Sequence, residues 1–112
     1  MKIEERFLEY VKFDTQADPD STLTPSTMKQ KELSKYLVEE LRKLGVLNAS
    51  MNEHGEVYAH LDANCDDKDR IGFIAHMDTA PDCSGKDIKP RIVKNYDGND
   101  IQLNEKVVLS PK

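Results

Sequence analysis

The chain has 112 residues and a formal charge of −5, with 33% charged and 38% apolar residues. This length suits one small domain. The acidic balance disfavours nucleic acid and anionic membranes as partners, because both require clustered Lys and Arg. The sequence has no run of about 20 apolar residues that could span a bilayer. The first residues, MKIEERFLEY, form an acidic amphipathic pattern rather than a secretion signal, so a cytoplasmic location is expected.

Two helices are predicted in the first half of the chain. Apolar residues recur at helical spacing from about Lys2 to Phe13, and glutamates lie off this stripe. After a loop rich in Asp, Pro, Ser and Thr, Pro25 to Thr27 open a second helix, in which Thr27 and Gln30 have capping-box spacing. Gly45 suits the left-handed residue that ends a helix. The apolar stripe of the second helix is Leu33, Leu37, Leu41 and Leu44.

Strands are predicted after the second helix. Leu47–Met51 and Glu56–Leu61 flank the turn NEHG, and residues 65–70 form a charged turn. Ile71–His76 is apolar on both faces until its last residue, which is typical of a strand covered on both sides in a mostly parallel sheet. The predicted fold class is therefore α/β with three layers. Beyond Ala80 only short extended stretches and turns follow, so the sheet looks incomplete; a compact α+β module with one solvated face is the alternative.

His76 and Asp78 follow the apolar run and, as residues i and i+2 of a strand, emerge on the same side. Ligands gather at the carboxyl ends of strands in open α/β sheets. A metal-bound imidazole normally donates its other N–H to a carboxylate or carbonyl. The pattern makes His76 a candidate ligand of Zn²⁺, for which Mn²⁺ or Co²⁺ could substitute. It makes Asp78 the candidate carboxylate that orients the His76 ring. The alternative is a structural pair in which His76 hydrogen-bonds to Asp78 and caps the strand.

The other candidate ligands have less support. His54 lies in a turn and His60 in an alternating strand, where solvent exposure or packing is expected. Cys65 and Cys83 lack the spacing of a structural zinc site, and a disulfide is not expected in the cytoplasm. A catalytic zinc site needs three or more protein ligands, so one histidine is insufficient. The later acidic residues stand in turn-like segments without a ligand pattern: Asp82, Asp87, Asp97, Asp100 and Glu105.

The stretch IGFIAHMDTAPDCSGKDIKPRIVKNYDGNDIQL resembles the peptidase T family, bacterial tripeptide aminopeptidases of the co-catalytic zinc exopeptidase group. ERFLEYVKFDTQ and the PST before the second helix are similar to it as well, so the resemblance runs from about Glu5 to Pro111. HMDT alone is typical of a wider group of zinc aminopeptidases, carboxypeptidases and deacylases. APDCSGK, IVKNYDG and the final LSP are what narrow the resemblance to peptidase T.

The resemblance implies that His76 is a ligand of one of two zinc ions and that Asp78 is the catalytic-site aspartate that orients it. It implies a cytoplasmic enzyme that removes the N-terminal residue of tripeptides, with a glutamate as general base. In the family, the remaining ligands and a second domain for dimerisation and covering the site lie beyond the position of Lys112.

Residues 1–112 are accordingly expected to be the N-terminal part of a zinc peptidase catalytic domain, with the second domain absent. As an isolated fragment the chain is expected to be inactive and able to self-associate through its incomplete sheet. The alternative function is a small non-catalytic α/β binding or interaction module with a structural His–Asp pair.

Overall fold

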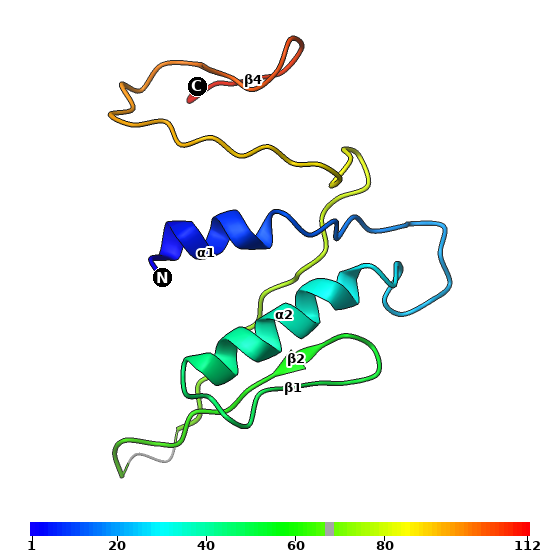
Figure 1. Ribbon diagram of the computed structural model, residues 1–112, viewed down its shortest axis with the longest axis vertical. Coiled ribbons are helices and arrows are strands. Elements are labelled where there is room, and N and C mark those ends of the chain that lie inside the picture. Colours follow the sequence, from blue (N-terminus) through cyan, green and yellow to red (C-terminus); the bar gives the residue numbers. More distant parts are fainter. Residues whose placement is uncertain (67–68) are drawn as a thin grey trace.

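A computed structural model describes residues 1–66 and 69–112. The elements are, in chain order, α1 (Ile3–Tyr10), α2 (Gln30–Lys43), β1 (Ser50–Met51), β2 (Val57–Tyr58), β3 (Ile101–Gln102) and β4 (Val108–Leu109). β1 pairs with β2 and β3 with β4, both antiparallel. The β1–β2 hairpin lies along α2, whereas the orange and red C-terminal residues run apart from both helices (Figure 1). Among the described residues, neither helix combines the length and the apolar character that crossing a membrane would need.

Helix α2 lies at the centre of the buried core. Leu33 and Val38 from the helix are buried, and the helix ends before Gly45 at φ +96°, as predicted. It begins at Gln30 rather than at Pro25 to Thr27, because the preceding residues form turns whose carbonyls accept the amides of residues 30–32. Thr27 and Gln30 do interact, but through their side chains: Gln30 Nε2 donates to Thr27 Oγ1 at 3.1 Å. The predicted capping box is therefore replaced by a side-chain pair.

Helix α1 is shorter than the predicted Lys2–Phe13, and its apolar stripe is not buried. None of its residues is buried, and Phe7 is exposed. The contacts of α1 with α2 run from Arg6 to the C-terminal end: Arg6 Nε lies 3.5 Å from Glu40 Oε1, and the Tyr10 ring lies 6.0 Å from the ring of Tyr36 in an edge-on arrangement. The Tyr10 hydroxyl also donates to Glu40. Burial, followed by this hydrogen bond, raises the pKa of Tyr10 to about 12. The helix is thus held from Arg6 to its C-terminal end.

The turn between β1 and β2 confirms the prediction for NEHG. Gly55 has φ +86°, a conformation that L side chains rarely adopt. The Asn52 side-chain oxygen accepts the amides of His54 and Glu56 at 3.0 and 2.9 Å. Each strand has two paired residues, fewer than predicted. The turn chemistry is therefore predictable from the local sequence, whereas the strand length is not.

The hairpin docks on α2 through buried polar and apolar groups. The fully buried Ser34 hydroxyl donates to the Gly55 carbonyl at 2.6 Å. Ala49, which precedes β1, is buried, and its carbonyl accepts Arg42 Nε at 3.2 Å. The buried residues among those described are the apolar Leu33, Val38 and Ala49, the polar Thr15 and Ser34, and Gly55.

The prediction of a buried strand at Ile71–His76 is wrong for the described residues. The segment has no ladder partner among them and is drawn without a strand arrow (Figure 1). Phe73 is 94% exposed. A strand is stabilised only when neighbouring strands take up its backbone N–H and C=O groups. For the same reason the described residues do not form the predicted parallel three-layer sheet; they form a small α/β unit with two antiparallel hairpins. The predicted charged turn at 65–70 includes residues 67 and 68, which lie outside the described residues.

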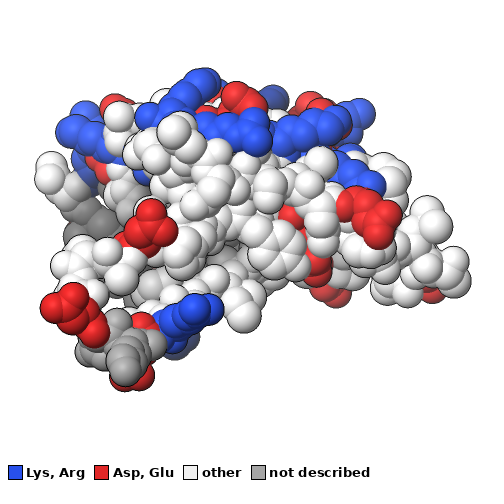
Figure 2. Space-filling view, turned by 90° about the horizontal axis from the view of Figure 1, so that it is seen from below, with Lys and Arg blue, Asp and Glu red and all other residues white. Residues whose placement is uncertain are grey.

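The surface combines mixed charge with exposed apolar side chains. On the face shown in Figure 2, Lys and Arg lie beside Asp and Glu along one edge, next to a broad area of uncharged side chains. The unpaired segment supplies three of the large exposed apolar residues: Ile71, Phe73 and Ile74. Apolar surface of this kind marks a region where association is favourable.

Candidate metal centre

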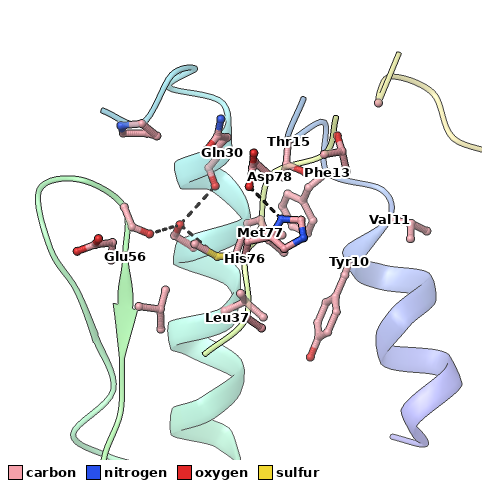
Figure 3. Close-up of a pocket in the computed structure, with 18 of the residues that line it drawn as sticks. Tyr10, Val11, Phe13, Thr15, Gln30, Leu37, Glu56, His76, Met77 and Asp78 are labelled. Atoms are coloured by element: carbon pink, nitrogen blue, oxygen red, sulfur yellow. Dashed lines mark hydrogen bonds and ion pairs between the residues drawn. The ribbon is translucent and has the colours of Figure 1, made fainter. Parts of the chain in front are cut away.

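His76 and Asp78 contact each other as both interpretations of the sequence expect. With its proton on Nδ1, the imidazole donates to Asp78 Oδ1 at 3.0 Å, as the dashed line between the two labelled residues shows (Figure 3). The His76 side chain is 85% exposed and that of Asp78 is 44% exposed. A carboxylate on Nδ1–H favours the tautomer whose Nε2 carries a free lone pair. The imidazole can therefore offer Nε2 to a ligand.

The chain contains a second His-x-Asp sequence, at His60 and Asp62, and its geometry differs. There Nε2 rather than Nδ1 approaches the carboxylate, at 3.5 Å, which is long for a hydrogen bond. His54 lies 3.6 Å from Glu53, and both histidines are exposed, as predicted. Only His76 has its Nδ1 at hydrogen-bond distance from a carboxylate, within residues 1–66 and 69–112.

The residues on either side of Asp78 contact the rest of the fold. Met77 is half-buried, and its sulfur lies 3.7 Å from the hydroxyl of the buried Ser34 on α2. On the other side, the Thr79 amide donates to the Thr15 carbonyl at 3.1 Å, and the Ala17 amide donates to the Thr79 carbonyl at 2.9 Å. These two bonds make a parallel bridge between Gln16 and Thr79. Asp78 therefore lies between a half-buried residue and one whose backbone is hydrogen-bonded on both sides.

The segment that receives Thr79 is itself tied to the start of α2. Thr27 Oγ1 donates to the Gln16 carbonyl at 2.9 Å, and Lys29 Nζ lies 2.8 Å from Asp14 Oδ1. The bond from Lys29, followed by the amide of Gln16, lowers the pKa of Asp14. Sequence reasoning identified the segment around Asp14 only as a loop, so these contacts were missed. The Thr27–Gln30 spacing was the one local signal, and it was assigned to a helix cap.

An open groove of about 1430 Å³ runs past the pair. Its walls come from α1, α2, the turn before β2 and residues 73–80. Figure 3 shows apolar side chains among its labelled residues, including Val11, Phe13 and Leu37. His76 and Asp78 thus lie where a mostly apolar groove meets solvent, which is the setting expected of a small-molecule site.

Few side chains near the pair could bind a metal ion. No group of three or more His, Cys, Asp or Glu residues suited to a metal occurs among the described residues. Cys83 lines the same groove but is a free, exposed thiol, and Cys65 is also free. The acidic residues set aside at the sequence level are exposed: Asp82, Asp87, Asp97, Asp100 and Glu105. The residues present fit one imidazole ligand and its orienting carboxylate.

The curated relatives that match this chain lead to one class of protein, the peptidases. No protein-family model matches the chain. Curated relatives named peptidase T match it from Clostridium perfringens at 57% identity, Clostridium acetobutylicum at 55% and a Geobacillus species at 54%. The matches cover 98%, 96% and 99% of this chain but only 27%, 27% and 28% of the relatives. The chain thus spans little more than a quarter of their length, and the predicted resemblance to peptidase T is confirmed.

Proposed function

We propose that this chain is the N-terminal part of the catalytic domain of a metal-dependent tripeptide aminopeptidase of the cytoplasm. The observation that carries the proposal is the 3.0 Å contact between His76 Nδ1 and Asp78 Oδ1, which leaves Nε2 free on an exposed ring. The similarity to peptidase T at 57% identity supports the choice of reaction. The substrate, a tripeptide, and the cytoplasmic location belong to the proposal.

The donor set fits one part of a zinc site. His76 would bind Zn²⁺ through Nε2, and Asp78 would keep the proton on Nδ1 and stabilise positive charge on the ring. When bound, zinc supplies Lewis-acid polarisation of the scissile carbonyl. Because one imidazole cannot hold a catalytic metal, the remaining ligands would come from polypeptide that corresponds to the rest of the relatives' length. The same part of the polypeptide would also contain a second domain, which would cover the site.

The isolated 112-residue chain is expected to bind zinc weakly and to hydrolyse no tripeptide. A tripeptide assay with the purified chain tests the second point. Turnover that a chelator abolishes would contradict it. Stoichiometric, tight uptake of zinc at neutral pH would contradict the single-ligand assignment.

The role of His76 is tested by titrating the chain with Zn²⁺ while the ring resonances of all three histidines are followed by NMR. The resonances of His76 are expected to shift first, with a preference that Asp78→Asn reduces. His60 is a matched internal control, because it stands in the same His-x-Asp spacing without the Nδ1 contact. Equal responses from His60 and His76 would contradict the metal assignment and favour a non-catalytic binding module with a structural pair.

A further inference from the structure

We propose that Thr27 is a positioning residue for the candidate site, acting through the segment 15–17 to hold Asp78 against His76. The proposal rests on the proposed function, since it concerns the same imidazole. It assigns a role to a side chain that lies on the approach to α2, outside the metal-binding pair.

The first step is the direction of the hydrogen bonds at Thr27. The Gln16 carbonyl can only accept, so the single hydroxyl proton of Thr27 goes to it, at 2.9 Å. Gln30 Nε2 then donates to the same hydroxyl at 3.1 Å, and also to Ser26 Oγ at 3.1 Å. These hydrogen-bond directions fix the side-chain rotamer of Thr27 and the orientation of the Gln30 side-chain amide. Thr27, on the approach to α2, thereby holds the carbonyl of Gln16.

The second step is the link from Gln16 to the site. Its neighbours Thr15 and Ala17 supply the carbonyl and the amide that bind the backbone of Thr79. The Gln16 side chain adds a third bond, from Nε2 to the carbonyl of Pro81 at 2.9 Å. The segment therefore binds the chain on the C-terminal side of Asp78 at two residues, Thr79 and Pro81.

The third step is the asymmetry of the pair. Asp78 lies between the half-buried Met77 and Thr79, whose backbone is hydrogen-bonded, whereas residues 71–75 are exposed and have no ladder partner among the described residues. The Nδ1 bond to Asp78 is the one hydrogen bond of the His76 ring in the part of the chain that the structure describes. The orientation of the imidazole therefore depends on the position of Asp78, and that position depends on the bridge that Thr27 supports.

The experiment compares Thr27→Val with Thr22→Val in the metal-free 112-residue chain. Valine keeps the shape of threonine and removes the hydroxyl, and Thr22 is exposed, with no hydrogen bond through its side chain. Two quantities are measured: hydrogen exchange of the Thr79 and Ala17 amides, and the tautomer of neutral His76 from its ring nitrogen shifts. Thr27→Val is expected to speed exchange by about threefold to tenfold, as for the loss of one hydrogen bond, and to reduce the Nδ1–H tautomer. Thr22→Val and the rescue variant Thr27→Ser are expected to match the unaltered chain.

Unchanged exchange and tautomer in Thr27→Val would overturn the proposal. So would rapid exchange of Thr79 in the unaltered chain, because the bridge would then not be formed. Faster exchange without a tautomer change would mean that Thr27 is structural only. The zinc titration separates this proposal from the proposed function: a tautomer change without a selective zinc response at His76 supports positioning and contradicts the metal role. Selective zinc binding at His76 with no effect of Thr27→Val supports the metal role and contradicts positioning by Thr27.

Discussion

Residues 1–60 and residues 69–112 differ in how much of their surface they bury and in whether their segments find partners. The first region holds all the buried residues of the described chain, and the second holds none. In the first region, α2 and the β1–β2 hairpin are close in sequence, and each supplies packing and hydrogen-bond partners for the other. In the second, an apolar segment at Ile71–His76 has no neighbour to pair with. Local elements form from nearby residues, whereas a strand buried on both faces depends on distant ones. The candidate site lies at the junction, where the second region touches the first.

The largest expected effect tests whether stability resides in the first region. Leu33→Ala should lower the free energy of unfolding by about 2–5 kcal/mol, because it removes a buried side chain and leaves a cavity. Phe73→Ala removes a larger side chain that is exposed, and is expected to change it by less than about 0.5 kcal/mol. Urea unfolding followed by circular dichroism measures both. Equal losses would show that the two regions do not differ in this way.

Ser34→Ala tests the polar contact that joins α2 to the hairpin. The variant leaves the Gly55 carbonyl without its 2.6 Å donor in a buried position, at an expected cost of about 1–3 kcal/mol. Ser110→Ala, at an exposed position near the C-terminus, is the matched control and should be neutral. Thermal unfolding of the two variants decides the point. A neutral Ser34→Ala would mean that water replaces the hydroxyl.

The exposed segment of the second region should cause self-association. Phe73→Lys is expected to weaken association by about tenfold or more, because one large apolar side chain no longer leaves water and two like charges meet. Leu23→Lys, at an exposed position in the loop before α2, serves as the control. Sedimentation velocity over a range of concentrations measures the change. A chain that is monomeric at all concentrations would contradict the prediction.

The smallest expected effect concerns the end of α1. The pKa of Tyr10 is raised from 10.0 to about 12 in the folded chain, so the folded state holds this proton more tightly than the unfolded state. Its contribution to stability is therefore complete below pH 10 and is lost as the pH rises toward 12. Tyr10→Phe should flatten this part of the stability profile, while Tyr96→Phe, at an exposed residue, should not. If Tyr10→Phe leaves the dependence of stability on pH unchanged, the loss of stability between pH 10 and 12 does not come from Tyr10.

Sequence reasoning predicted the features that depend on near neighbours. The end of α2 at Gly45 and the turn at Gly55 follow from the backbone freedom of glycine. Helical spacing predicted the stripe of α2 in part, since Leu33 is buried but Leu44 is exposed. The predicted contact of His76 with Asp78 is present, although residues 71–76 do not form the strand from which it was expected. Each of these needs only a few consecutive residues to specify it.

The features that sequence reasoning missed depend on partners far away in the chain. The burial of Ile71–His76 was inferred from its apolar composition, which shows what a segment could bury but not whether a neighbour is present. The apolar stripe of α1 likewise shows what the helix could bury, and Phe7 on it is exposed. The Gln16–Thr79 bridge uses backbone groups, which every residue has, so no side-chain pattern marks it.

The Gln16–Thr79 bridge also bears on the order of folding. The helix α2 and the β1–β2 hairpin close loops of a few residues, on the microsecond scale of such elements. The bridge must close a loop that includes both of them, at a higher cost in chain entropy, and it gains only a few hydrogen bonds. The His76–Asp78 site is therefore expected to be assembled last and to open first, so that a metal would reach it only after the helix and hairpin are in place.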